Sequence, residues 1–242
     1  MIFLLAFIGS LFALAGGILF LYNQKWTKFL ISYSVPFAAG VLLTVSLVGM
    51  LPEAFEMSGE GVFTAALLAF LGAYVFENFV FNLHHHKDCT HCKHLEKSVA
   101  LLVLGDTIHN FIDGVAIAAT YLIMPGLGIA TAISTFLHEF PHEISDFGIL
   151  LKAGWKKNKI IWIKILSSLA TFLGVFFVLF VSKESSLVGM LLALAAGLFL
   201  YLGASDFLPR IEEDKKLTNK QSFAALFSGI LIMLLVINLV PS

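Results

Sequence analysis

Two stretches of the sequence combine imidazole, carboxylate and amide side chains at helical spacing. The first runs His109-Asn110-Phe111-Ile112-Asp113, with Asp106 one turn before it. The second runs His138-Glu139-Phe140-Pro141-His142-Glu143, with Asp146 one turn after it. Residues three or four apart share a helix face, so each stretch would present a stripe of metal ligands. Imidazole suits zinc, iron, copper and nickel, and carboxylate also suits manganese. The pattern predicts a mixed nitrogen and oxygen site that holds a divalent first-row ion reversibly.

Both stretches lie within long apolar segments. Hydrophobic residues make up 59% of the chain and charged residues only 13%, whereas soluble domains carry about 25% charged residues. An ionisable side chain at membrane depth costs about 2.5–3.5 kcal/mol on insertion scales, and such residues usually mark an ion or substrate path. A hydrogen bond between helices would explain a single histidine or asparagine. It is a poor explanation for so many polar groups on two adjacent segments, so we expect a polytopic membrane protein with an ion site.

A membrane-spanning helix needs about 20 apolar residues, and this length divides the chain into eight spans. Only helices or closed barrels satisfy the backbone in lipid, and the runs lack the alternation of barrel strands. We therefore expect an all-α integral membrane protein with one polytopic domain over 1–242 and no separate soluble domain. The predicted spans are 1–22, 31–54, 61–83, 98–122, 126–151, 160–181, 186–208 and 222–240.

The lysines and arginines predict the orientation of these spans. All but two of the 15 basic residues fall in the odd-numbered loops. The positive-inside rule then places those loops in the cytoplasm and both termini outside, most simply in the plasma (inner) membrane of the cell. Of the two exceptions, Lys183 lies in an even-numbered loop, and Lys164 lies just inside the sixth span, where we expect it to snorkel to the interface.

An internal repeat is indicated by two short motifs. Ala38-Ala39-Gly40 and Leu51-Pro52 in the second span recur as Ala195-Ala196-Gly197 and Leu208-Pro209 in the seventh span, always 157 residues later. The alternative is chance similarity between two helices rich in alanine and leucine. The two spans cross in opposite directions, and inverted repeats are typical of transporters with a site near the midplane. We expect an inverted repeat of spans 1–3 and 6–8 around the central spans 4 and 5.

A second group of potential ligands lies in the predicted cytoplasmic loop 84–97. It combines a Cys-x-x-Cys motif with five histidines, which is zinc-ligand chemistry, although a solvated loop enriched in histidine by chance is the alternative. We expect weak metal capture or regulation here, and we expect Asp206, at the inner end of the seventh span, to line the exit. The loop candidates are His84, His85, His86, Cys89, His91, Cys92 and His94.

An enzymatic function is the main alternative to transport. His138-Glu139-x-x-His142 also matches the H-E-x-x-H motif, in which two histidines bind zinc and the glutamate is the general base of a protease. Pro141 inside the motif, the second ligand-rich helix and the repeat favour transport instead. The sequence contains no P-loop, so we expect no ATP-driven step in this chain. We also expect no catalytic residues, no bound organic cofactor and no nucleic-acid partner.

The pair HNFIDG and HEFPHE resembles the signature of the ZIP (Zrt/Irt-like) divalent-metal transporters. The stretch 137–154 resembles the histidine-rich subgroup of that family, and the eight-span layout also fits. The resemblance implies a homodimer in the lipid bilayer that carries divalent metal ions into the cytoplasm. Zn2+ is the expected ion, with Fe2+, Mn2+ or Cd2+ as other candidates.

The resemblance also implies roles for individual residues. It assigns His109, Asp113 and His142 to the principal metal site. A neighbouring site would use Asn110 and Glu139, with His138 and Glu143 assisting, while Asp106 and Asp146 remain candidates for the path. Some relatives carry a glutamate in the sixth span, but this chain has Thr171 at the corresponding place. We therefore expect one well-formed metal site, with a second ion optional.

Overall fold

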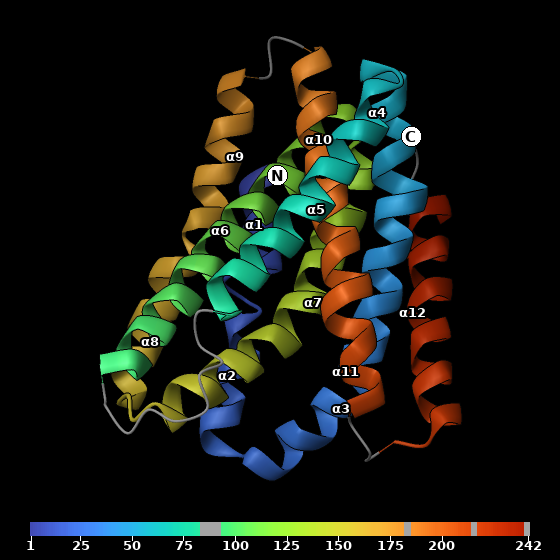
Figure 1. Cartoon of the computed structure of the whole chain (residues 1–242). Coiled ribbons are helices and arrows are strands. Elements are labelled where there is room, and N and C mark those ends of the chain that lie inside the picture. Colours follow the sequence, from blue (N-terminus) through green and yellow to red (C-terminus); the bar gives the residue numbers. More distant parts are fainter. Residues whose placement is uncertain (83–92, 182–184, 214–216, 240–242) are drawn as a thin grey trace.

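The computed structural model describes residues 1–82, 93–181, 185–213 and 217–239, and every regular element in these ranges is helical (Figure 1). Seven segments are long and apolar enough to cross a membrane. The eighth predicted span is α7, which is long enough but carries the second polar stretch. The predicted all-α membrane fold is confirmed. In order, the helices are α1 (Ile2–Gly9), α2 (Leu14–Tyr22), α3 (Gln24–Thr44), the π-helix η1 (Val45–Met50), α4 (Leu51–Ser58), α5 (Gly61–Asn82), α6 (Lys93–Ile123), α7 (Pro125–Lys152), α8 (Lys157–Ser168), α9 (Ala170–Val181), α10 (Ser185–Tyr201), the π-helix η2 (Leu202–Phe207), α11 (Leu208–Glu213) and α12 (Asn219–Leu239).

The ends of α7 follow from its sequence. Pro125 occupies the first turn, where its missing N–H needs no helical partner and its fixed φ already suits a helix. After the last turn, Gly154 adopts a φ of 83°, a left-handed conformation that glycine adopts without steric cost. The chain can therefore reverse direction and enter α8. These two ends fix the level at which the polar stretch of α7 lies beside α6.

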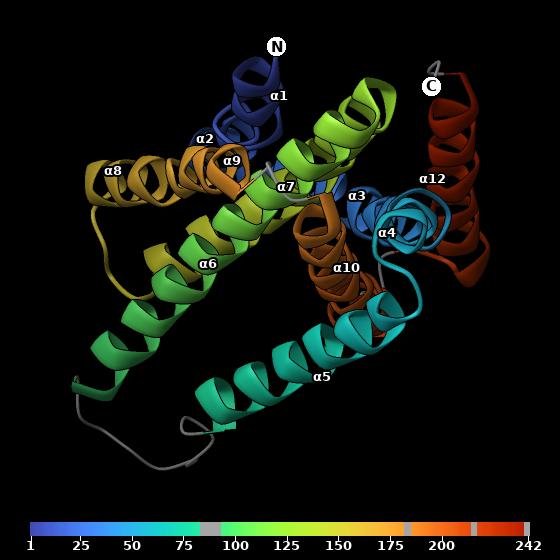
Figure 2. The same ribbon diagram turned by 90° about the horizontal axis from the view of Figure 1, so that it is seen from above.

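The helices pack as two groups that meet at α7. In one group α3 packs against α12, and α10 packs against α4 and α5; in the other, α7 packs against α1, α2 and α6, and α6 also packs against α9. The groups touch where α3 meets α7 and where α10 meets α6. Seen from above, α7 lies in the middle of the bundle, while α5, α8 and α12 lie at its edge (Figure 2). The ligand-bearing faces of the two polar stretches thus point into the bundle, whereas Ile108 of α6 is exposed.

The same break interrupts the second and the seventh span. In η1 the Leu51 N–H bonds to the Ser46 carbonyl, and in η2 the Leu208 N–H bonds to the Gly203 carbonyl. Both are i to i−5 bonds, and both precede a proline that lacks an N–H for the preceding turn. The two bonds are related by the 157-residue offset of the sequence motifs. This coincidence supports the predicted repeat, which nonetheless stays a prediction.

Glycines at matching positions allow helices to pack with their backbones in contact. Gly40 of α3 faces the Leu226 carbonyl of α12, and Gly197 of α10 faces the Ala66 carbonyl of α5. A methyl group at either glycine would overlap the opposing carbonyl. Small residues at such crossings are the usual means of close approach between membrane helices. Positions 40 and 197 also differ by 157, so the two halves of the chain have a close helix contact at matching glycines.

Gly174 is predicted to tolerate no side chain, because α6 and α9 cross with Gly174 against the Phe111 carbonyl. Gly174→Ala should lower the free energy of unfolding by about 1–3 kcal/mol, the usual cost of overpacking. Denaturant unfolding in detergent micelles, followed by circular dichroism, measures this loss. Gly72→Ala is the matched control, since a Cβ there meets no atom within 4 Å. Equal losses in the two variants would contradict the packing argument.

Candidate metal centre

Four side chains from the two polar stretches converge between α6 and α7. One ligand atom from each lies within 4.8 Å of every other, and we call this set the first cluster: His109, Asp113, His138 and Glu139. His109 and Asp113 are one turn apart on α6, whereas His138 and Glu139 are adjacent on α7. Three of the four residues are fully buried, and His109 is only slightly exposed. Their helices are antiparallel neighbours, so each contributes two ligands from its facing side.

The distances within the first cluster suit a tetrahedral divalent ion. His109 Nε2 lies 3.2 Å from His138 Nε2 and 3.6 Å from Asp113 Oδ2. His138 Nε2 lies 3.5 Å from Asp113 Oδ2. With zinc bonds of about 2.0–2.2 Å to nitrogen and oxygen, the edge of a tetrahedron is roughly 3.3–3.6 Å. Only small side-chain movements would bring all four ligands onto one ion.

The carboxylates of the first cluster face only the two imidazoles. Among the residues that the structure describes, no donor other than His109 and His138 lies close to an oxygen of Asp113 or Glu139. A buried carboxylate without partners is costly, and native proteins almost always satisfy such groups. Glu139 Oε1 has one close neighbour, His109 Nε2 at 2.7 Å. A divalent cation held by the four ligands would compensate the negative charge of both acids.

The orientation of His138 prepares one nitrogen for a metal. Its Nδ1 lies 2.9 Å from the Ser134 carbonyl one turn earlier in α7. A carbonyl only accepts, so Nδ1 is the donor of this bond, and Nε2 faces Asp113 Oδ2, where its lone pair could bind a metal. Metal-binding histidines are commonly oriented by such a bond from their other ring nitrogen. The Phe199 ring packs against the edge of the same imidazole and further restricts its rotation.

The resemblance assigns His142 to the principal metal site, but its ligand atoms lie outside the first cluster, so this role stays a prediction. The structure places His138, rather than His142, with His109 and Asp113, and it groups His142 with Asp106 and Asp146. His138 and His142 are one turn apart on the same face of α7, so periodicity alone cannot decide which of them reaches Asp113. The crossing level of the two helices decides it. The His142 ring still stacks near the His109 ring at a centroid distance of 5.4 Å.

Asn110 is engaged in a hydrogen-bond network rather than in the first cluster. Its Oδ1 accepts bonds from Ser10 Oγ at 2.8 Å and from Thr171 Oγ1 at 3.2 Å. Its Nδ2 donates to the Asp106 carbonyl at 3.0 Å. Thr171, at the place where the resemblance leads one to expect a sixth-span glutamate, is therefore a donor to Asn110. The network ties α1, α6 and α9 together, and the metal role of Asn110 stays a prediction from resemblance.

Asn110→Ala separates a packing role from a metal role. Because the Thr171 hydroxyl would lose its acceptor, and the Ser10 hydroxyl would keep only the Ser168 carbonyl, we expect the free energy of unfolding to fall by about 1–3 kcal/mol. We expect the number of zinc ions bound per chain to stay the same. Denaturant unfolding and elemental analysis after dialysis give the two quantities. A variant of unchanged stability that loses a zinc ion would show instead that Asn110 is a ligand.

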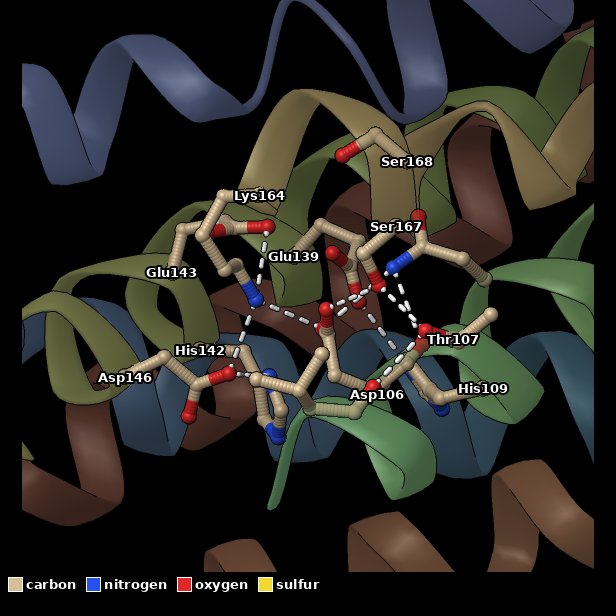
Figure 3. Close-up of polar contacts among 12 residues, drawn as sticks. Asp106, Thr107, His109, Glu139, His142, Glu143, Asp146, Lys164, Ser167 and Ser168 are labelled. Carbon is tan, nitrogen blue, oxygen red and sulfur yellow. Dashed lines mark hydrogen bonds and ion pairs between the residues drawn. The ribbon is translucent and has the colours of Figure 1, made fainter. Parts of the chain in front are cut away.

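A second cluster, toward the start of α6 and the end of α7, contains a lysine. Lys164 of α8 points its Nζ between acids from α6 and α7 (Figure 3), 2.7 Å from Asp106 Oδ1, 2.8 Å from Asp146 Oδ2 and 3.2 Å from Glu143 Oε1. We call these residues and His142 the lysine cluster. The prediction that Lys164 snorkels to the interface is wrong, because its side chain is fully buried. One feature of the sequence is consistent with this buried position. Lys164 is a single basic residue a full turn inside an apolar span, with isoleucine on both sides.

Among the acids of the two clusters, Asp106 is the one whose carboxylate oxygens have the most donors close by, in contrast to Asp113. Besides the contact with Lys164, its Oδ2 accepts a short bond of 2.5 Å from Ser167 Oγ. The amide of Asn110 lies 3.3 Å from its Oδ1. Donors from α6 and α8 therefore hold this carboxylate in place (Figure 3).

The remaining predicted residues lie outside these clusters. Asp206 in η2 pairs with Arg210 one turn later, with 2.7 Å between Oδ1 and Nη2, and its place on an exit path stays a prediction. The side chain of His94, in the first turn of α6, is not among those described. The other loop candidates fall outside the described residues: His84, His85, His86, Cys89, His91 and Cys92.

Comparison with known proteins identifies the family of this chain. The family described as ZIP zinc transporter matches residues 82–237. The chain is 33% identical over 138 residues to the zinc transporter foi of Drosophila melanogaster, covering 56% of this chain and 20% of that protein. It is 38% identical over 109 residues to human zinc transporter ZIP4, covering 45% of this chain and 17% of that protein. It is 36% identical over 144 residues to the metal cation symporter ZIP14 of Xenopus tropicalis, covering 56% of this chain and 31% of that protein. The matched region thus spans less than a third of each of these relatives.

Proposed function

Because this chain belongs to the ZIP zinc transporter family, we propose that it carries zinc or a similar divalent cation across a membrane through the first cluster. It is an integral membrane protein, since seven of its helical segments are long and apolar enough to cross the bilayer. The named relatives described above are zinc transporters and a metal cation symporter. The intramembrane protease alternative gains no support from any of them.

One observation carries the proposal: two imidazoles and two carboxylates meet in the buried middle of the bundle, at distances that suit one divalent ion. Ligands on two different helices make the site sensitive to any movement of one helix past the other. A carrier needs such a site, since it must bind its ion on one side and release it on the other. The mixed donor set also favours reversible binding over a permanent structural zinc, which is typically held by cysteines.

The direction of transport is proposed from the charges of the loops. The basic residues of the odd-numbered loops favour a cytoplasmic position for those loops, so ions would enter near the turn between α6 and α7 and leave past the lysine cluster. We propose the plasma membrane as the location, with both termini outside. The start of α1 and the end of α12 lie toward the same end of the bundle (Figure 1), which is consistent with an even number of spans. A homodimer is proposed from family resemblance alone.

The test is uptake of zinc into liposomes. Purified protein is reconstituted around a zinc-sensitive dye, and the initial rate is compared with that of protein-free liposomes. We expect saturable uptake, with Cd2+, Mn2+ and Fe2+ as competitors that rank the selectivity of the site. Uptake no faster than in protein-free liposomes, under conditions where the protein is folded and inserted, would refute the proposed function. Cleavage of peptides by the same sample would revive the protease alternative.

A further inference from the structure

Lys164 is a buried cation with a set of partners that a metal could also use. Its side chain is fully buried in α8, and Nζ contacts carboxylates from two other helices, as described above (Figure 3). Three acids around one ammonium are more than a single ion pair requires. If Lys164 were absent, the negative charge of these three acids, next to the first cluster, would attract a second cation.

The partners of Lys164 have metal-binding geometry of their own. Ligand atoms of Asp106, His142 and Asp146 lie within 4.8 Å of one another. His142 Nδ1 has no hydrogen-bond partner in the described part of the chain, and it lies 3.9 Å from Asp146 Oδ2. Imidazole with two carboxylates is a ligand set that zinc accepts. The Lys164 ammonium contacts both carboxylates of this set, with Nζ 2.7 Å from Asp106 Oδ1 and 2.8 Å from Asp146 Oδ2.

An ammonium and a divalent ion would compete for these carboxylates. Each oxygen that faces Nζ at hydrogen-bond distance would have to face the ion instead, and the two cations would repel one another at close range in a poorly screened interior. Lysine also cannot serve as a ligand while it is charged, because it has three donors and no acceptor. The first cluster contains no lysine or arginine in the described structure, so a divalent ion meets no such competitor there.

We propose that the buried ammonium of Lys164 occupies the lysine cluster in place of a metal, so that the protein binds one divalent ion. Replacing Lys164 by a neutral residue would then open a second divalent-ion site between Asp106, His142 and Asp146. This inference rests on the proposed function only in assigning the first ion to the first cluster. It also gives a reason for the single site. The sixth span supplies a fixed positive charge beside the proposed metal site.

The test counts metal ions in purified protein. Wild type, Lys164→Gln and Lys164→Arg are equilibrated with Zn2+ in detergent, dialysed and analysed by elemental mass spectrometry. We expect one zinc ion per chain in wild type and in Lys164→Arg, and two in Lys164→Gln. The amide of the introduced glutamine can still donate to the carboxylates, so this variant retains part of the packing. Adding Asp146→Asn to Lys164→Gln should return the count to one.

The outcomes separate this inference from the proposed function. An equal zinc count in wild type and Lys164→Gln overturns the inference, and so does a count of two in wild type. A wild type without zinc that gains one ion in Lys164→Gln supports the role of Lys164 but contradicts the first cluster as the ion site. If Lys164→Gln folds poorly without metal, its thermal unfolding is measured against zinc concentration. Stabilisation by zinc well beyond that of wild type supports the second site, and stabilisation equal to that of wild type refutes it.

Discussion

Asp113→Asn is expected to reduce the initial rate of zinc uptake on the order of 100-fold or more. Replacing a partner that merely orients a ligand typically costs 10–100-fold in metal affinity or activity, and Asp113 is proposed to contact the ion itself. The asparagine has the same shape, so packing around the fully buried side chain is preserved. What is lost is the negative charge that faces the imidazoles of His109 and His138 and would face the ion. Initial rates in dye-loaded liposomes measure the effect.

Two further variants test whether the loss of uptake comes from the missing charge at position 113. Glu60→Gln also converts a carboxylate to an amide, but at an exposed position, and we expect it to transport like wild type. Asp113→Glu keeps the charge while lengthening the side chain by one methylene, and we expect partial activity. Near-normal uptake by Asp113→Asn would place the ion path outside the first cluster. A loss in Glu60→Gln as large as that in Asp113→Asn would point to a general effect on the membrane protein.

Lys164→Met is expected to lower the free energy of unfolding of the metal-free protein by about 3–5 kcal/mol. That is the usual cost of removing one partner from a buried ion pair, because the opposite charge is left uncompensated. Here the remaining carboxylates of Asp106, Glu143 and Asp146 face one another with no cation between them. Methionine fills a similar volume, so the loss is electrostatic rather than a cavity effect. Denaturant unfolding in detergent, with a chelator present, measures it.

A surface lysine provides the control for this variant. Lys159 is exposed and lies over the Trp155 ring, so Lys159→Met should change stability by well under the loss at position 164. A Lys164→Met protein as stable as wild type would show that the carboxylates of the lysine cluster do not depend on the ammonium. Restoration of stability by added zinc in Lys164→Met, but not in Lys159→Met, would connect this result to the second site proposed above.

The helices and the polar face of each central span could be predicted from the sequence because both depend on local rules. Apolar runs of sufficient length indicate spans, and the helical period places His109 with Asp113 and His138 with His142. The common breaks at 45–50 and 202–207 also had a local cause, in Pro52 and Pro209. These features require no knowledge of how the helices meet.

The remaining features depend on contacts between helices. Which of His138 and His142 reaches Asp113 is decided by the crossing level of α6 and α7, and one turn of either helix would exchange them. Ser10 lies at the break of the first span between α1 and α2, and its contact with Asn110 joins residues 100 positions apart. Lys164 was predicted to lie at the interface because its position, close to a span end, allows snorkelling. The acids that hold it inside come from α6 and α7 and reach it only through the packing of three helices.

Locating zinc directly in the protein tests the account most sharply. Crystals grown with zinc, measured on both sides of the zinc absorption edge, show the ion by its anomalous scattering. The account predicts one peak between Nε2 of His109 and Nε2 of His138, at about 2.0–2.1 Å from each nitrogen, with oxygens of Asp113 and Glu139 completing the site. A principal peak among Asp106, His142 and Asp146, with Lys164 displaced, or no peak near Asp113, would contradict it.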